Sequence, residues 1–72
     1  MTQGGKRILV TGMSGMIGGM VGRSLARDNY VRALNRSPVE GVDCVQADIS
    51  DLDAIRPAFD GIDTVVHMAA YL

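Results

Sequence analysis

The feature that most constrains this chain is a set of glycines spaced three residues apart, directly after a short apolar segment. Gly12, Gly15 and Gly18 follow residues 7–11, which contain Ile-Leu-Val without alternating polar residues. A continuous apolar run of this length indicates a strand that is covered on both faces of a sheet. Glycine permits a sharp turn and a close approach of the backbone to another group. The pattern therefore predicts a strand, a tight loop and a helix, in that order.

A helix is expected from Gly15 to Asp28, because apolar residues recur there at helical spacing. Ile17, Val21 and Leu25 lie four residues apart and predict the stripe that the helix buries. Packing in the core or in the loop is also expected for two methionines of this segment, which are Met16 and Met20.

Three more strands are predicted at residues 30–34, 43–47 and 64–68, each rich in apolar residues. Residues 37–42 contain a proline and a glycine and are expected to form a loop, where a helix would otherwise join two parallel strands. Strands that alternate with helices pair in parallel through right-handed crossovers. The predicted fold class is therefore α/β: the N-terminal half of a Rossmann-type doubly wound parallel sheet, with four strands in the order 3-2-1-4.

The second helix is expected to begin at Ser50 as its N-cap, with Asp53 three residues later in the pattern of a capping box. Pro57 lies beyond the first turn, so this helix should be short, kinked or partly 3₁₀. Gly61 is expected to end it. The predicted apolar face of this helix consists of Leu52, Ile55 and Phe59.

The glycine loop offers what a bound pyrophosphate needs, namely backbone N–H donors with no side chain in the way. Gly12 permits the turn out of the strand, Gly15 lets the phosphates approach, and Gly18 lets the helix pack tightly. The helix N-terminus adds the positive end of its dipole. In the commonest dinucleotide fingerprint a glycine stands where this chain has Ser14. The phosphate loop of NTPases requires a lysine after its last glycine, and the sole lysine here is Lys6.

Thr-Gly-x-x-Gly-x-x-Gly at residues 11–18 resembles the extended branch of the short-chain dehydrogenase/reductase family, which contains NAD-dependent epimerases and dehydratases. Residues 47–51 and 63–70 resemble two further segments of that family, in the same order. The resemblance implies that Asp48 accepts a hydrogen bond from the adenine amino group, and that small residues after the fourth strand lie along the adenosine. The loop and the resemblance together predict these cofactor-binding residues: Gly12, Ser14, Gly15, Met16, Ile17, Gly18, Asn35, Arg36, Asp48, Ile49, Ala69 and Ala70.

The end of the second strand bears on the choice of cofactor. An acid there would bind the ribose 2′-hydroxyl of NAD(H) and would repel a 2′-phosphate. Asn35 and Arg36 stand there instead, and a guanidinium offers planar, permanently charged donors to a phosphate. We therefore expect NADP(H) to be favoured over NAD(H). The alternative is that Arg36 is a solvated loop residue.

No catalytic residue is predicted within this chain. The resemblance implies a Tyr-x-x-x-Lys pair, but Tyr30 has Leu34 four places on, and Tyr71 is followed by one residue. We therefore expect residues 7–72 to be a partial NAD(P)-binding domain, truncated after the fourth strand, at the N-terminus of a longer oxidoreductase, epimerase or dehydratase; residues 1–6 are expected to be a flexible tail. Two alternatives remain: a non-catalytic nucleotide-binding or redox-sensing module, and a truncated product that is inactive alone. A downstream Tyr-x-x-x-Lys would favour the enzyme.

Charge and composition limit the partners and the location. Seven basic and eight acidic side chains give a net charge of −1. Nucleic-acid-binding proteins carry an excess of Lys and Arg, so we do not expect nucleic acid as a partner. No run of about 18 apolar residues is present, so no membrane span is expected. The single cysteine, Cys44, cannot form an internal disulfide, which fits the reducing environment of the cytoplasm. Its side chain is expected to pack in the core.

Two further expectations concern the fourth strand. His67 is a lone histidine in an apolar segment, so a place in the core is expected rather than a role in metal binding, and no metal site is predicted. The edge of the sheet beyond this strand would be uncovered, and uncovered edges invite pairing with another chain. Self-association through that edge is therefore a further expectation.

Overall fold

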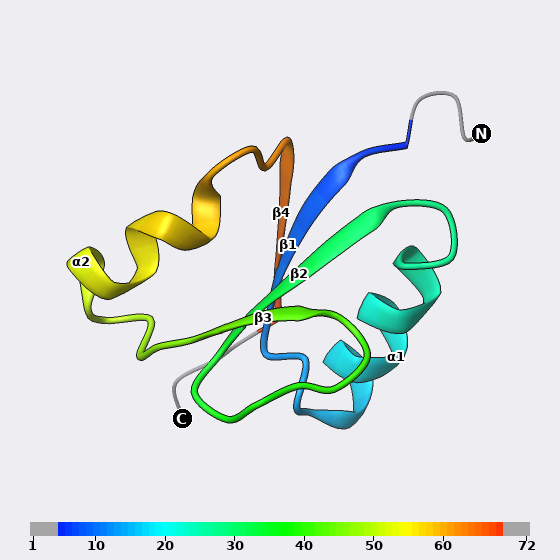
Figure 1. Ribbon diagram of the computed structural model, residues 1–72. Coiled ribbons are helices and arrows are strands. Elements are labelled where there is room, and N and C mark those ends of the chain that lie inside the picture. Colours follow the sequence, from blue (N-terminus) through cyan, green and yellow to red (C-terminus); the bar gives the residue numbers. More distant parts are fainter. Residues whose placement is uncertain (1–4, 69–72) are drawn as a thin grey trace.

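The computed structural model describes residues 5–68. Its four strands form one parallel sheet in the order β3-β2-β1-β4 (Figure 1). The strands are β1 Arg7–Thr11, β2 Tyr30–Asn35, β3 Asp43–Gln46 and β4 Thr64–His67. The predicted strand order, the parallel pairing and the fold class are therefore confirmed.

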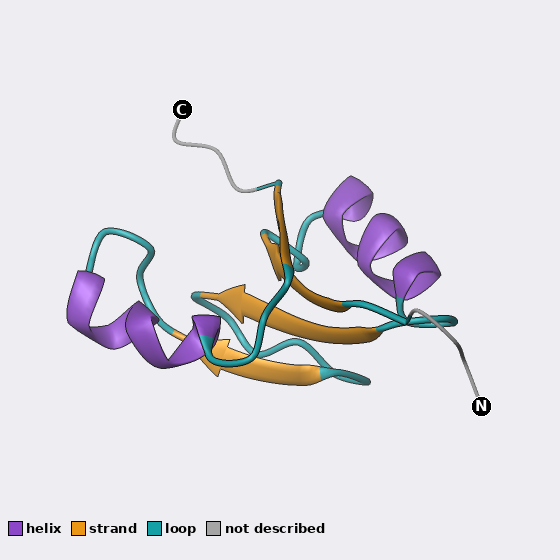
Figure 2. Ribbon diagram, turned by 90° about the horizontal axis from the view of Figure 1, so that it is seen from above, coloured by secondary structure: helices purple, strands orange, loops and turns teal. Residues whose placement is uncertain are grey.

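Helical elements cover the two faces of the sheet. They are α1 Met16–Leu25, α2 Leu52–Ile55 and the 3₁₀ turn η1 Arg56–Phe59. Successive residues of a strand point to opposite faces, and β1 divides its side chains accordingly. Ile8 and Val10 belong to the hydrophobic cluster against which α1 packs, while Leu9 belongs to a second cluster with Ile55 and Ala58. The helical segments therefore lie on opposite sides of the sheet, as Figure 2 shows.

The buried face of α1 differs from the predicted stripe. Its buried residues are Gly18, Gly19 and Gly22, whereas Ile17 is 65% exposed and Met20 is 68% exposed. The prediction that Ile17 lies on the buried face is therefore wrong, and so is the predicted packing of Met20.

The physical reason for this difference is the close approach of α1 to the loop before it. A Cβ atom at Gly18 would lie 2.1 Å from the carbonyl oxygen of Gly12, which is backbone that cannot move aside. A Cβ atom at Gly22 would lie 2.4 Å from the terminal methyl carbon of Met13, whose side chain is buried. The glycine face must therefore turn inward, and this rotation leaves Met16 outside, contrary to the prediction that it packs in the core or in the loop.

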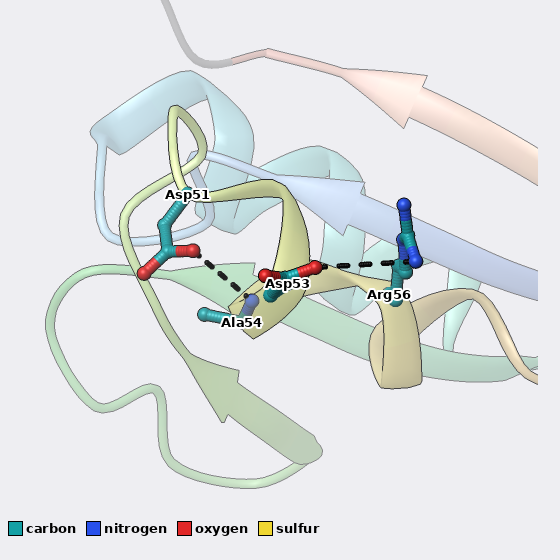
Figure 3. Close-up of polar contacts among 4 residues, drawn as sticks. All are labelled: Asp51, Asp53, Ala54 and Arg56. Carbon is teal, nitrogen blue, oxygen red and sulfur yellow. Dashed lines mark hydrogen bonds and ion pairs between the residues drawn. The ribbon is translucent and has the colours of Figure 1, made fainter.

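The start of α2 lies one residue later than predicted. Asp51, not Ser50, is the N-cap, and its Oδ1 accepts a hydrogen bond from the backbone N–H of Ala54 at 3.3 Å (Figure 3). Ser50 instead donates its hydroxyl to Asp48, so it is not available to the helix. Asp53 lies in the first turn, with its Oδ1 3.9 Å from Arg56. The predicted capping box does not form, because the backbone N–H of Ser50 donates to Asp48.

A 3₁₀ turn follows α2 directly, which confirms the expectation that the helix is short and partly 3₁₀. The change of period from 3.6 to 3 residues per turn also moves the buried face. Ile55 and Ala58, three residues apart, are buried, whereas Leu52 is 66% exposed and Phe59 is 43% exposed. The predicted apolar face is thus wrong at its two ends. Gly61 adopts a φ of 71° after the turn and ends this helical segment, as expected.

Three smaller features complete the fold. Residues 37–42 form a loop, as predicted, and Val39 anchors it in the cluster under α1. Cys44 is half-buried against the same cluster, which confirms its expected packing. Lys6, which we assigned to the tail, accepts a hydrogen bond from the N–H of Tyr30 at 2.9 Å and therefore extends the first strand pair. Among the described residues, no helix has the length and hydropathy that crossing a bilayer requires.

Candidate nucleotide-binding site

The carboxyl ends of the parallel strands meet at one edge of the sheet. Thr11, at the end of β1, pairs with Leu34 on one side and with His67 on the other, so the three strands end within one residue of each other. A hollow of about 830 Å³ opens at this edge and is lined by residues of the glycine loop and of each strand end. Ligands of open α/β sheets bind at such an edge, where the strand order reverses. Here the reversal lies between β1 and β4.

The glycine loop forms the floor of this hollow. Gly12 turns the chain out of β1 with a φ of 78°, a conformation that favours glycine, and its carbonyl accepts a hydrogen bond from the N–H of Gly15 at 3.2 Å. Gly18 lies so close to Gly12 that no side chain fits between them. The predicted structural roles of Gly12 and Gly18 are therefore confirmed.

The first turn of α1 opens onto the loop without a side-chain cap. Gly15 is the N-cap residue, and no acidic residue lies in the first turn. The N–H groups of Met16, Ile17 and Gly18 have no acceptor within the helix, because they belong to its first turn. Together with the helix dipole, they give this end of α1 a partial positive charge. The arrangement suits an anionic group.

The predicted cofactor-binding residues fall into four groups. Those that line the hollow are Gly12, Ser14, Gly15, Asn35, Arg36 and Ile49. Met16 lines an adjoining hollow of about 500 Å³, which shares Ser14 and Gly15 with the first. Ile17, Gly18 and Asp48 line neither of these two hollows. Ala69 and Ala70 lie outside the described residues.

Asn35 and Arg36 differ sharply in their surroundings. Asn35 is 9% exposed, and its side-chain amide donates to the carbonyl of Ser37 at 2.9 Å, which holds the turn after β2. Arg36 is exposed and makes no hydrogen bond or ion pair within residues 5–68. It is also the one charged side chain among the described residues that line the hollow. The guanidinium is therefore available to an anion bound there.

Asp48 has a local partner in this structure. Its Oδ1 accepts hydrogen bonds from the backbone N–H of Ser50 at 2.9 Å and from the hydroxyl of the same residue at 2.7 Å. These bonds shape the turn that leads into α2. The adenine contact that the family resemblance implies for Asp48 stays a prediction.

His67 is not in the core, so that expectation is wrong. It is exposed and lines the hollow, and its Nδ1 lies 2.8 Å from the hydroxyl oxygen of Thr11 in a hydrogen bond. The same hydroxyl oxygen accepts a hydrogen bond from the N–H of Met68 at 3.0 Å. These contacts join the ends of β1 and β4. Thr11, His67 and Met68 were missed, although the last residues of adjacent parallel strands always share an edge.

The comparisons with known proteins agree with this geometry. The model of the NAD dependent epimerase/dehydratase family matches residues 8–72. L-arabinose 1-dehydrogenase (NAD(P)(+)) of Haloferax volcanii is 44% identical over 64 residues, which are 89% of this chain and 25% of that protein. The 3 beta-hydroxysteroid dehydrogenase/Delta 5-->4-isomerase of Mycobacterium tuberculosis is 39% identical, over 92% of this chain and 20% of its own length. The chain thus spans a quarter or less of these relatives.

Solved structures give the same result. A short-chain dehydrogenase/reductase superfamily protein from Agrobacterium tumefaciens, with bound NAD, matches with a TM-score of 0.83 and 31% identity, over 92% of this chain and 21% of that one. MoeE5, in complex with UDP-glucose and NAD, matches with a TM-score of 0.68 and 28% identity, over 90% of this chain and 22% of its own. With a family model matched over nearly the whole sequence, this chain belongs to the NAD dependent epimerase/dehydratase family.

Proposed function

We propose that the hollow at the carboxyl edge binds a nicotinamide dinucleotide, with its pyrophosphate against the opening of α1. The observation that carries this proposal is the uncapped first turn of α1, which lies beside a loop whose Gly12 and Gly15 present backbone without side chains. A Cβ atom at Gly15 would meet nothing closer than 3.5 Å, so the fold itself does not require glycine there. A ligand that touches the backbone would require it. When bound, the nicotinamide ring would supply hydride transfer.

The preferred cofactor is NADP(H) rather than NAD(H). Arg36 supports this choice, because its exposed guanidinium lines the hollow and has no partner among the described residues. Asn35 stands where an acid would exclude a 2′-phosphate, and its amide is occupied by Ser37. A 2′-phosphate beside Arg36 would therefore meet a cation and no carboxylate from β2.

The dinucleotide module serves a longer NAD(P)-dependent enzyme of the oxidoreductase, epimerase or dehydratase type. The printed names of the relatives, a sugar dehydrogenase and a steroid dehydrogenase/isomerase, support this assignment. The substrate region and a Tyr-x-x-x-Lys pair would lie in sequence that follows β4. Cytoplasmic location is supported by the unpaired Cys44, which fits a reducing compartment.

The edge of β4 supports a second, weaker role in self-association. Within the described residues β4 pairs with β1 alone, and Val65 on this strand is 48% exposed. Sedimentation over a range of concentrations tests this role. A sedimentation coefficient that rises with concentration, and that no longer rises in Val65→Lys, would support pairing through β4.

A two-dimensional amide NMR spectrum of the chain, titrated with NADPH and then with NADH, tests the cofactor proposal. The expected result is that signals around the loop from Gly12 to Gly18 and around Arg36 shift, and that they shift at a lower concentration of NADPH than of NADH. Dispersed signals that respond to neither nucleotide would refute dinucleotide binding. Equal responses to both would leave the binding site in place and remove the preference for NADP(H).

A further inference from the structure

The sequence predicts that Asn35 contacts the cofactor, but half of its side-chain amide is already used within the protein. The amide nitrogen donates to the carbonyl oxygen of Ser37 at 2.9 Å, and Asn35 is only 9% exposed. A carbonyl oxygen can only accept, so this bond also fixes which way round the amide lies. The backbone carbonyl of Asn35 accepts the N–H of Ala47 at 3.0 Å. Asn35 is therefore held at both its backbone and its side chain.

The hydrogen bond from Asn35 to Ser37 spans a single residue, which is Arg36. It closes a small ring that contains both peptide units beside Arg36, so it restricts the two backbone torsions of that residue. Pro38 restricts Ser37 from the other side. The chain bends at Arg36 within this ring, and the Arg36 side chain lines the hollow. The bond thus fixes the backbone from which the guanidinium enters the hollow.

We propose that Asn35 is a positioning residue, which acts on the dinucleotide through Arg36 and not by contact with it. The assignment rests on the proposed function, in which the 2′-phosphate lies beside Arg36. Arg36 makes no hydrogen bond or ion pair within residues 5–68, so no polar contact there orients its long side chain. Such a side chain loses rotamer entropy when it binds an anion. A backbone that is already fixed keeps the total loss of entropy smaller.

The oxygen of the same amide defines the alternative. It accepts no hydrogen bond within residues 5–68, and Asn35 lines the hollow. A ribose hydroxyl that donates to this oxygen would be the direct contact that the sequence predicts. NADH and NADPH share the ribose 3′-hydroxyl, and NADH alone has the free 2′-hydroxyl. Loss of a direct contact would therefore weaken NADH at least as much as NADPH, whereas loss of positioning would weaken NADPH alone.

A double-mutant cycle between Asn35→Ala and Arg36→Ala in the full chain tests the proposal, with both affinities measured by isothermal titration calorimetry. Asn35→Ala should weaken NADPH about fivefold and NADH less than about twofold, as expected for one lost hydrogen bond that acts through Arg36. In the Arg36→Ala background, Asn35→Ala should have no further effect on NADPH affinity. Equal losses for the two nucleotides, or a loss that persists without the arginine, would overturn the proposal.

Asn29→Ala is the matched control for a general loss of stability. The amide nitrogen of Asn29 also donates to a backbone carbonyl oxygen, that of Leu25, at 2.9 Å, and Asn29 does not line the hollow. This substitution should leave the ratio of NADPH to NADH affinity unchanged. A ratio that falls as far in Asn29→Ala as in Asn35→Ala would show that the ratio follows stability, which overturns the positioning role.

A measurement without nucleotide separates this inference from the proposed function. In the free chain the backbone order parameter of Arg36 should be close to that of the strands, about 0.85, and should fall in Asn35→Ala. An unchanged order parameter overturns the positioning role, even where NADPH binds. A fall in a chain that binds neither nucleotide supports the positioning role and refutes the proposed function instead. Where Asn35→Ala does not fold, Asn35→Leu takes its place, because leucine has a similar branched shape and no donor.

Discussion

The α-helices α1 and α2 begin in opposite ways at the same edge of the sheet. The first turn of α1 follows β1 and starts at Gly15, with no side-chain cap and no acid. The first turn of α2 follows β3 and starts at Asp51, whose carboxylate accepts the N–H of Ala54, with Asp53 beside it (Figure 3). Both helices have N–H groups that need acceptors. The carboxylate of Asp51 accepts one of those of α2, whereas no side chain among residues 5–68 caps the first turn of α1.

This difference separates a structural helix start from a binding one. Two carboxylates at α2 repel an anion, while α1 presents its partial positive charge to a hollow that contains Arg36. The glycines that flank the start of α1 also divide their tasks. Gly18 is required by the backbone of Gly12, whereas Gly15 has space for a Cβ atom. Substitutions at Gly18 therefore test the role of the glycines in folding, and substitutions at Gly15 test their role in binding.

The largest effect is expected for Gly18→Ala. Its Cβ atom would lie 2.1 Å from the carbonyl oxygen of Gly12 and 2.9 Å from the carbonyl carbon, so α1 must move away from the loop. We expect the free energy of unfolding to fall by about 3 kcal/mol, which is most of the stability of a domain of this size. Urea denaturation followed by circular dichroism measures the change.

Gly15→Ala is the matched control for that prediction. Its Cβ atom makes an ordinary contact at 3.5 Å, and Gly15 has φ −75° and ψ 160°, a conformation open to any residue. Its unfolding free energy should stay within about 0.5 kcal/mol of the original. Equal destabilisation by both substitutions would contradict the division of tasks between the two glycines.

Binding should be lost when the larger Gly15→Val side chain enters the hollow. The branched side chain would stand between the phosphates and the first-turn N–H groups, which removes charge-assisted hydrogen bonds. NADPH affinity should fall by about a hundredfold or more, while the far-ultraviolet spectrum of the fold is retained. Isothermal titration calorimetry with NADPH measures this loss. Unchanged affinity would show that the opening of α1 is not where the pyrophosphate binds.

A smaller and cofactor-specific loss is expected for Arg36→Ala. Removal of the guanidinium should weaken NADPH about thirtyfold and NADH less than about threefold, because the 2′-phosphate is the group that differs. Arg56→Ala is a matched control, since Arg56 is an exposed arginine that pairs with Asp53 and does not line the hollow. Equal losses for the two cofactors would remove the assignment of the 2′-phosphate to Arg36.

The fold was predictable from the sequence because its main determinants are local. Apolar runs define the four strands, and glycines with positive φ, at Gly12 and Gly61, mark the turns that the sequence indicated. The faces of the helices were not predictable from apolar spacing alone. The rotation of α1 depends on how close Gly18 comes to Gly12, and that of α2 depends on where the 3₁₀ turn begins. Both are contacts or geometries that a periodic pattern does not contain.

The parts of the candidate site that depend on the local backbone were predictable from the sequence. The parts that depend on contacts between distant residues were less predictable. The glycine loop and Arg36 lie where their motif places them, at the ends of β1 and β2. The prediction for His67 was wrong, because the apolar residues around it indicated a core position. The sequence did not show that His67 is the last residue of its strand. Its hydrogen bond to Thr11 joins residues 56 positions apart and has no signal in the sequence.

The smallest effect concerns the start of α2, where the sequence favoured Ser50 and the structure has Asp51. Asp51→Ala should lower the unfolding free energy by about 1 kcal/mol, the usual value of an N-cap, without changing NADPH affinity. Ser50→Ala should cost less, about 0.5 kcal/mol, because it removes only the exposed hydrogen bond to Asp48. Chemical denaturation of the two variants measures the order. A larger loss of unfolding free energy for Ser50→Ala than for Asp51→Ala would indicate that Ser50 is the N-cap. A gain in NADPH affinity for Asp51→Ala would show that α2 also faces the cofactor.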